Sequence, residues 1–307
     1  MEPHCFGLLR AVIGKRQSPR DGRGPSPAFG ASPPARSCGL ASGRPVPWKV
    51  DCVLDYLRDT LLQFRSWPGT SLTSAARQWV WDRLSAEGVA RFPFPPHGRI
   101  PNFAGAEVAA VRLLDIEPWK SATVIKVNPD SPQRPVRAEA LRRGIAVFVA
   151  TPRLRGGFKK LDPHRIPPDK IDEAASLSRG NRWAEEVALA NMPVLDAIVC
   201  GSVAVTRDGR RCGKGEGYSD LEFAILRELG HPPVPTATTV HDLQVVDSVP
   251  RDPTDQPLSV IATPTHAIRI KRPSAAPRGI EWTRLSAEDL EEMPILAELK
   301  RMTNRMP

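Results

Sequence analysis

The chain has 307 residues, of which 41% are hydrophobic and 25% charged, and its formal net charge is +9. This length suits one large or two ordinary domains with a sizeable buried core, and no apolar run is long enough to predict a membrane-spanning helix, so no membrane partner is expected. Residues 1–69 hold ten Lys and Arg against five Asp and Glu, which leaves a modest positive excess for the remainder. That excess suits an anionic ligand and does not by itself indicate nucleic acid.

The cysteines and the N-terminal segment bear on the cellular compartment and on where the folded domain begins. Five cysteines form no Cys-x-x-Cys pair, which predicts free thiols in a reducing compartment, and we expect a cytoplasmic monomer. Residues 1–47 hold eight prolines and seven glycines and almost no acid, so we expect a disordered tail. An organellar transit peptide and a mispredicted translation start are the alternatives. The apolar spacing of residues 48–64 predicts a short amphipathic helix, so residues 48–69 form a helical linker to a domain over residues 70–301, followed by a tail of residues 302–307.

The first helix of the domain is predicted to begin after Ser71 or Ser74 and to end near Gly88, with Ala76, Trp79, Val80, Leu84 and Val89 toward the core. Arg77 falls in its first turn, where it either binds an anion or is solvated. A proline-rich loop follows over residues 92–99, because proline excludes helix there. Its His97 either faces a ligand or is simply exposed.

Helices and strands then alternate. We predict helices over residues 105–114 and 136–143 and strands over residues 122–127 and 145–150, a spacing typical of a parallel sheet covered on both faces. Ligands bind such sheets beyond the carboxyl ends of the strands. Arg153 and Arg155 come directly after the strand that ends at Ala150, so they either reach this crevice and pair with phosphate or carboxylate groups, or form a solvated basic loop.

A glycine loop between a strand and a helix is the most informative stretch. Apolar runs at residues 197–200 and 203–205 predict buried strands, and Arg207-Asp208-Gly209 predicts a tight turn. Gly213, Gly215 and Gly217 then alternate with Lys214 and Glu216, a spacing that lets backbone N–H groups surround an anion, although three such glycines also occur in ordinary tight loops. A helix should follow and end near Gly230, which would place the phosphate at a helix N-terminus.

Charged groups beside this loop extend the phosphate hypothesis. Arg211 and Lys214 add cations, and Asp220 is a candidate magnesium ligand. Farther on, we predict strands over residues 238–246 and 258–262, the first interrupted by His241 and Asp242 at an exposed end or a site edge. A last helix beginning near Leu285 is expected to pack outside the site.

These segments resemble one family. Arg211-x-Gly213-x-Gly215-x-Gly217-Tyr218-x-Asp220 resembles the Arg-x-Gly-x-Gly-Gly-Gly-Tyr-Tyr-Asp-Arg signature of 5-formyltetrahydrofolate cyclo-ligases, and its Gly-Lys-Gly-Glu-Gly-Tyr form is similar to the methenyltetrahydrofolate synthetase domain-containing branch. Five further segments fit that branch in matching order across residues 70–301: Phe92 to Phe103, Lys126 to Asp130, Thr151 to Arg155, Thr239 to Asp242, and Lys271 to Pro273. Vertebrate members carry an RNA-recognition domain beyond this region, which we do not expect here.

The resemblance implies a three-layer αβα sandwich with a mostly parallel, Rossmann-like sheet of the NagB/RpiA/CoA-transferase type. It also implies ATP and Mg²⁺ as cofactors, a reduced folate as substrate, and closure of 5-formyltetrahydrofolate to 5,10-methenyltetrahydrofolate. The implied nucleotide contacts are Arg77, Arg211, Gly213, Lys214, Gly215, Gly217 and Tyr218, with Asp220 as the metal ligand. We assign Tyr218 and Arg153 as catalytic candidates and Arg155 and His241 as substrate-binding candidates.

Several departures from the family pattern keep other functions open. Thr73 and Ser74 stand where a lysine is expected, Leu221 replaces an arginine, and the region of Gln133 to Arg137 lacks the acid that contacts folate. A catalytically weak or inactive nucleotide- or RNA-binding module is therefore an alternative, although an aromatic stacking strand for RNA is missing. A phosphotransfer or phosphohydrolase role on another small molecule is a third.

Overall fold

A computed structural model describes residues 72–177 and 180–303 of the chain, and the tail and linker predicted for residues 1–69 lie outside these ranges. Its helices and strands run in this order: α3 (Leu72–Ala86), β1 (Ala90–Arg91), β2 (Asn102–Phe103), α4 (Ala106–Leu114), β3 (Val124–Val127), α5 (Arg134–Arg142), β4 (Ala146–Ala150), β5 (Phe158–Leu161), α6 (Ile171–Ala175), β6 (Ala184–Val187), β7 (Ala197–Cys200), β8 (Ala204–Thr206), β9 (Arg211–Cys212), α7 (Tyr218–Glu228), β10 (Thr236–Thr239), β11 (Val245–Val246), β12 (Val260–Ala262), β13 (Ala267–Arg269), α8 (Ala287–Glu292) and α9 (Pro294–Thr303).

The main sheet is mostly parallel, as the alternation of strands and helices predicts. Its strand order is β13-β12-β10-β7-β3-β4-β5-β6, and the five strands from β12 to β4 pair in parallel. The strands β13, β5 and β6 at its two edges are antiparallel. Central strand β7 is buried at every position, because Ala197, Ile198, Val199 and Cys200 form an apolar run that both faces of the sheet can bury.

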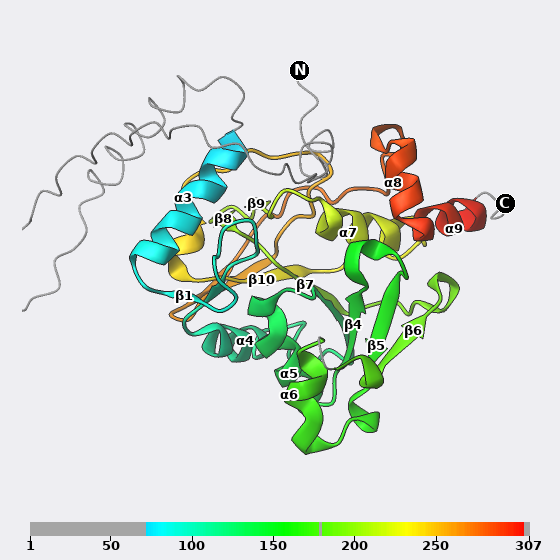
Figure 1. The fold of residues 1–307 in the computed structure, drawn as a ribbon, viewed down its shortest axis with the longest axis horizontal. Helices are drawn as coiled ribbons and strands as arrows, with labels where there is room; N and C mark the ends of the chain where they lie inside the picture. The colour runs from blue at the N-terminus through cyan, green and yellow to red at the C-terminus, as the bar shows by residue number, and fades with distance from the viewer. Residues whose placement is uncertain (1–71, 178–179, 304–307) are drawn as a thin grey trace, which may run out of the picture. The chain divides into compact units, whose positions relative to one another are not determined.

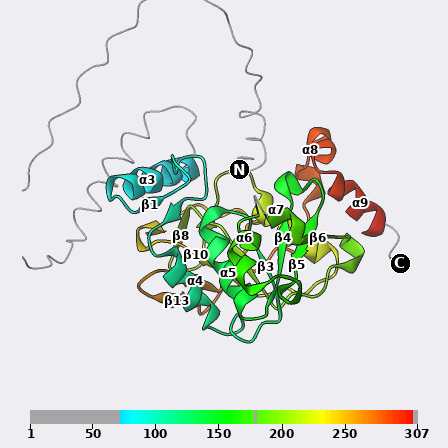
Figure 2. The same cartoon turned by 60° about the horizontal axis from the view of Figure 1, so that its bottom comes forward.

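Helices cover both faces of this sheet, which confirms the α/β class (Figure 1). On one face, α4, α5 and α6 pack against β3, β4 and β7 through a core that includes Leu113, Val136 and Ile171. On the other face, α7 and α9 pack through Ile225, Leu296 and Leu299. Figure 2, with the bottom brought forward, shows α5 and α6 in front of the sheet.

A smaller region built around α3 lies beside the main sheet. The strands β11, β8 and β9 form a three-stranded sheet, and β1 pairs with β2. Val80, Trp81 and Leu84 of α3 pack onto Val203 and Val249. Trp79 packs half-buried against this core, as the sequence predicted, and Trp81, which was not predicted, is buried in it. The helix begins at Leu72, so Arg77 lies in its second turn and the prediction of the first turn was wrong.

Two other elements differ from the predictions. The strand expected over residues 238–246 is instead β10, a short 3-10 turn from Asp242 to Gln244, and β11 in the smaller sheet. The side chain of His241 accepts a hydrogen bond from the backbone N–H of Leu243, so local capping ends the strand. Across the described residues, every helix is too short or too polar to cross a lipid bilayer.

Candidate functional site

A pocket of about 580 Å³ opens beyond the carboxyl ends of β3, β4 and β7. Each of these strands is followed by a segment that lines it: Asn128 to Asp130, Thr151 to Leu154, and Gly201. The glycine loop of residues 213–217 and residues 250–255 form the other walls. This is the edge of the sheet where ligands of parallel α/β proteins bind, as the sequence predicted.

The glycine loop presents unpaired backbone donors to this pocket. Gly215 has φ 109° and Gly217 has φ 72°, conformations that favour glycine, and Gly217 is the N-cap of α7. In the part of the chain that the structure describes, no intramolecular hydrogen bond uses the backbone N–H groups of residues 213–219. Seven successive free donors at a helix N-terminus form a site for an anion such as phosphate.

Arg77 closes the loop from the side of α3. Its Nε donates to the carbonyl oxygen of Gly213 at 2.7 Å, and a Cβ added to Gly215 would lie 3.3 Å from its Nη1. A side chain at position 215 would therefore crowd the guanidinium, and the φ of 109° there favours glycine independently. Thr73 also lines the pocket, at the position where the family pattern has a lysine.

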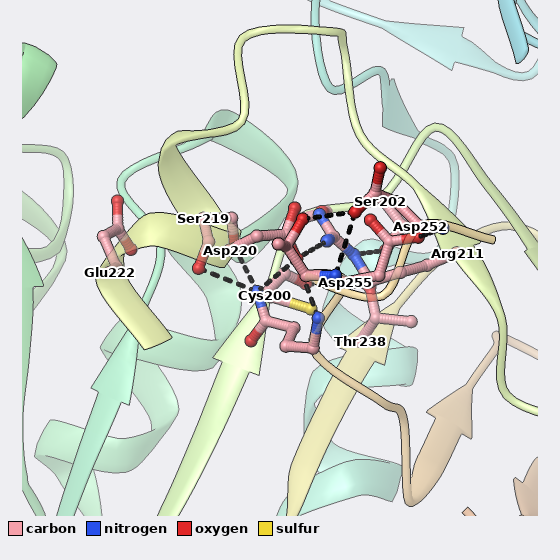
Figure 3. Close-up of polar contacts among 12 residues, drawn as sticks. Cys200, Ser202, Arg211, Ser219, Asp220, Glu222, Thr238, Asp252 and Asp255 are labelled. Carbon is pink, nitrogen blue, oxygen red and sulfur yellow. Dashed lines mark hydrogen bonds and ion pairs between the residues drawn. The ribbon is translucent and has the colours of Figure 1, made fainter. Parts of the chain in front are cut away.

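Arg211 contacts the first turn of α7 through Asp220 (Figure 3). Only 3% of this residue is exposed, and its guanidinium donates to Asp220 Oδ1 at 2.6 Å and to the carbonyl oxygen of Gly201 at 3.1 Å. Burial alone would lower the pKa of Arg211, but the nearby negative charges, that of Asp220 foremost, together outweigh burial and raise the pKa. Arg211 therefore acts here as the internal partner of Asp220, and its direct contact with phosphate stays a prediction.

Asp255 is an acid of this site that the sequence reasoning did not select. Its Oδ2 accepts from the backbone N–H of Asp252 at 2.8 Å. Burial and the nearby negative charge of Asp220 raise the pKa of Asp255 to about 6. Residues 249–263 resemble the Val-Pro-x-x-x-x-Asp-x-x-x-Asp/Ser-x-Ile/Val-x-Thr tail of the cyclo-ligases, with Asp255 at the first aspartate, and this resemblance is the signal that could have singled it out.

Asp130 lies on the pocket wall just before the turn that leads into α5. Its Oδ2 would lie 2.9 Å from a Cβ at Gly201, so glycine permits this close approach. Burial raises the pKa of Asp130, and the cations Lys214, Arg137 and Lys126 partly offset that effect. Residues 133–137 hold no acid, but Asp130, three residues before Gln133, places a carboxyl group on this wall.

Below this wall, two buried charges form an ion pair. Lys126 of β3 pairs with Glu222 of α7, and its Nζ donates to Asn128 Oδ1 at 2.6 Å. Glu222 also lines the pocket. The pair joins the central sheet to the helix that begins at the glycine loop, and so fixes the loop relative to the strand ends.

Arg153 and Tyr218 line the mouth of the pocket, as the sequence predicted. Arg153 and the next residue, Leu154, have φ 54° and 55°, a left-handed conformation that costs about 1–2 kcal/mol for each such residue. Leu154 is buried in the core, which anchors this turn and leaves Arg153 exposed at the opening. Burial and the charge of Glu216 raise the pKa of Tyr218, so its hydroxyl stays protonated as a donor.

Two predicted residues do not reach this pocket. Arg155 is exposed beyond the turn, and His241 packs against the ring of Phe103, 6.1 Å between ring centroids. Their roles in substrate binding stay predictions. His97 also lies elsewhere and contacts Asp82 at 2.8 Å.

The charged side chains that line the pocket determine which ligands it can bind. The free N–H groups, Arg77, Arg153 and Lys214 suit a polyphosphate, although Lys214 is paired with Glu216 at 2.8 Å. Within residues 72–177 and 180–303, no cluster of three or more metal-ligating side chains exists. Asp220 and Asp255 offer two carboxylates, and magnesium is commonly bound by one or two carboxylates together with phosphate oxygens and water.

Comparisons with known proteins point to one family. The sequence profile of the 5-formyltetrahydrofolate cyclo-ligase family matches residues 83–264, more than half of the chain. Methenyltetrahydrofolate synthase domain-containing proteins are similar: that of Mus musculus is 41% identical over 230 residues, 73% of this chain and 62% of the relative. That of Homo sapiens is 37% identical over 233 residues, 73% of this chain and 60% of the relative. The chain thus spans about three fifths of the length of these curated relatives.

A solved structure was also found, the NMR structure of Aquifex aeolicus 5,10-methenyltetrahydrofolate synthetase. Its TM-score is 0.43 at 17% sequence identity, and the match covers 69% of this chain and all of that one. The matched profile region contains Arg153, Arg211, the glycine loop and Asp220, which are the walls of the pocket. The chain belongs to the 5-formyltetrahydrofolate cyclo-ligase family.

Proposed function

We propose that the chain is an ATP- and magnesium-dependent cyclo-ligase that converts 5-formyltetrahydrofolate to 5,10-methenyltetrahydrofolate. The observation that carries the proposal is the run of seven free backbone N–H groups at the start of α7, inside the pocket of a chain that belongs to this family. Such a run binds phosphate groups, and ATP is the phosphate-bearing substrate that this reaction needs.

The reaction requires binding and positioning and no protein nucleophile. The γ-phosphoryl group of ATP passes to the formyl oxygen with release of ADP, N10 attacks the activated carbon, and the C–O bond breaks as phosphate leaves. The N–H groups of the loop and Arg77 would hold the phosphates, while Arg153 and the Tyr218 hydroxyl would face the transferred group from the mouth. Fixed donors aimed at developing negative charge lower the barrier because they need no reorganisation.

Asp220 and Asp255 are the residues that would hold magnesium. When bound, the ion would neutralise phosphate charge. The carboxyl group of Asp130 also lines the pocket, and N–H donors of a reduced pterin ring are the groups it suits. It would take the place of the family acid that contacts folate.

Two lost cations predict slow turnover. Leu221 is buried in the core, 5% exposed, and so contributes nothing to the pocket in place of the family arginine. Thr73 replaces the lysine at the pocket wall. Each contact to a charged group is worth about 1.5–3 kcal/mol, so we expect turnover ~100-fold or more below that of an ordinary family enzyme.

The test is an absorbance time course for methenyltetrahydrofolate with purified protein, with and without ATP, alongside a calorimetric titration with ATP. Slow, ATP-dependent product formation is expected. ATP binding without any product would overturn the enzyme proposal and favour a nucleotide-binding module that has lost turnover. Protein that neither binds ATP nor forms product would overturn both.

A further inference from the structure

An arginine beyond the family profile reaches the wall of the pocket. Arg284 lies twenty residues after the matched region ends, just before α8. Its Nη1 donates to Asp252 Oδ1 at 2.8 Å and to Oδ2 at 3.0 Å, and its Nε pairs with Glu281 at 2.7 Å. Asp252 lines the pocket, so this segment does not simply pack outside the site as the sequence suggested.

Asp252 organises a tight turn. Its Oδ1 accepts from the backbone N–H of Thr254 at 2.9 Å and from the Thr254 hydroxyl at 2.6 Å. Asp252 and Asp255 also exchange two hydrogen bonds, one from each backbone N–H. Burial would raise the pKa of Asp252, but the bonds from Thr254 and Arg284 outweigh it and hold the pKa below its usual value. The partner of Arg284 is therefore a carboxylate whose charge fixes the turn.

This turn also forms hydrogen bonds with the first turn of α7. The backbone N–H of Gln256 donates to Asp220 Oδ1 at 3.0 Å, and its Nε2 donates to the carbonyl oxygen and hydroxyl of Ser219. Asp220 is in turn paired with Arg211 (Figure 3). Polar contacts therefore connect Arg284 to Asp252 and Asp252 to Asp255, and the next residue, Gln256, is bonded to Asp220.

The same segment also holds the other end of α7. The backbone N–H of Ile280 and the indole N–H of Trp282 both donate to Glu228 Oε1, at 2.9 and 3.2 Å. Glu228 is the last residue of α7. Residues 280–284 therefore connect the end of this helix to the turn that contacts its beginning, and Arg284 is the link on the pocket side.

We propose that Arg284 is a positioning residue: it holds the Asp252–Gln256 turn so that Asp255 and Gln256 stay in place against Asp220. The effect on nucleotide affinity rests on the proposed function, because Asp220 and the loop beside it are its ATP site. The effect on the turn itself is independent of any ligand.

The test compares Arg284→Met and Arg284→Lys with Arg301→Met in the full chain. Arg301 is a matched control in the same C-terminal segment, where it is exposed and donates to the Ala297 carbonyl oxygen of its own helix. Two quantities are measured: amide hydrogen exchange at Gln256, with buried Ile225 of α7 as the internal reference, and the Kd for ATP by calorimetry.

For Arg284→Met we expect exchange at Gln256 to accelerate about tenfold or more while Ile225 is unchanged, and the Kd for ATP to rise about tenfold. Arg284→Lys should recover most of both effects, since it restores the charge, and Arg301→Met should match the wild type. If the exchange rate at Gln256 is the same in Arg284→Met as in the wild type, the proposal is overturned, whether or not the protein binds ATP. Faster exchange with an unaltered Kd also overturns it. If wild-type protein binds no ATP, the proposed function fails instead, and exchange at Gln256 alone decides the role of Arg284.

Discussion

The negative charge of Asp255 beside Asp220 lowers the stability of the folded protein. Burial and the negative charge of Asp220 raise the pKa of Asp255, and both carboxylates act on the buried cation Arg211. Two carboxylates near one guanidinium leave a surplus negative charge. Such a surplus of negative charge is unfavourable by itself and suits a site that binds a cation together with phosphate.

Replacing Asp255 with Asn should therefore stabilise the protein at neutral pH. The folded-state pKa of about 6 lies above the unfolded value of 3.8, so ionisation of Asp255 lowers stability as pH rises between these values. We expect Asp255→Asn to gain about 1–2 kcal/mol above pH 6, less than the full shift implies because water reaches the pocket, and the gain to vanish as pH falls to 4. Thermal unfolding measured from pH 4 to 8 checks this.

Asp208→Asn is the control with the opposite sign. The pKa of Asp208 is lowered, chiefly by the hydrogen bond from the Thr206 hydroxyl, so its charge stabilises the fold at neutral pH and that contribution is lost in acid. A melting temperature of Asp255→Asn that stays below the wild-type value at pH 7.5 would show that the carboxylate is stabilising after all.

At the scale of elements, α7 is built differently at its two ends. Its N-terminus leaves backbone donors open to the pocket, whereas its C-terminus is closed by Gly230, with φ 83°. The N–H of Gly230 donates to the Arg227 carbonyl oxygen and that of His231 to Leu226, the pattern of a Schellman cap. The helix is thus stabilised by its far end and its packed face, and its near end remains available for a ligand.

Gly215→Ala tests the open end, with Gly230→Ala as the matched control. Both glycines have positive φ, so alanine should cost about 1 kcal/mol of stability at either position. Only at Gly215 would the new Cβ meet the Arg77 guanidinium, at 3.3 Å; nothing lies within 4 Å at Gly230. We expect the rise in melting temperature on adding ATP to be largely lost in Gly215→Ala and kept in Gly230→Ala, as measured by differential scanning fluorimetry. Equal responses would mean that the loop is not the phosphate site.

The elements that the sequence predicted well are those with strong local signals. Central strand β7 is an uninterrupted apolar run, and α7 combines apolar residues at helical spacing with Gly230 at its end. The antiparallel pair of β5 and β6 was not predicted, because Phe158–Leu161 and Ala184–Val187 are four-residue strands with two charged residues each and no long apolar run. The strand conformation of β5 depends on its pairing with β4, and that of β6 on its pairing with β5, and no local pattern encodes either contact.

For the whole molecule, the sequence predicted the parallel sheet and the pocket at its edge, and it was least informative about contacts between distant segments. Asp130, Asp255 and Arg284 face the pocket or its wall because the fold brings three loops together, 29 or more residues apart in the chain. Contacts between distant segments also decide how much of the chain is needed for the domain to fold. The family profile ends at residue 264, whereas the core continues into α9.

A chain cut after residue 264 should therefore fail to fold. It loses five buried apolar side chains that belong to the same core cluster as α7: Ile280, Met293, Ile295, Leu296 and Leu299. Their burial contributes on the order of 10 kcal/mol, an upper estimate that equals the whole stability of a typical domain. We expect no cooperative thermal transition by circular dichroism. In the full chain, Leu296→Asp should produce the same loss, while Ala297→Asp, on the exposed side of the helix, should melt like the wild type. A cooperative transition in the shortened chain would show that the profile region folds alone, and would place the C-terminal segment outside the core.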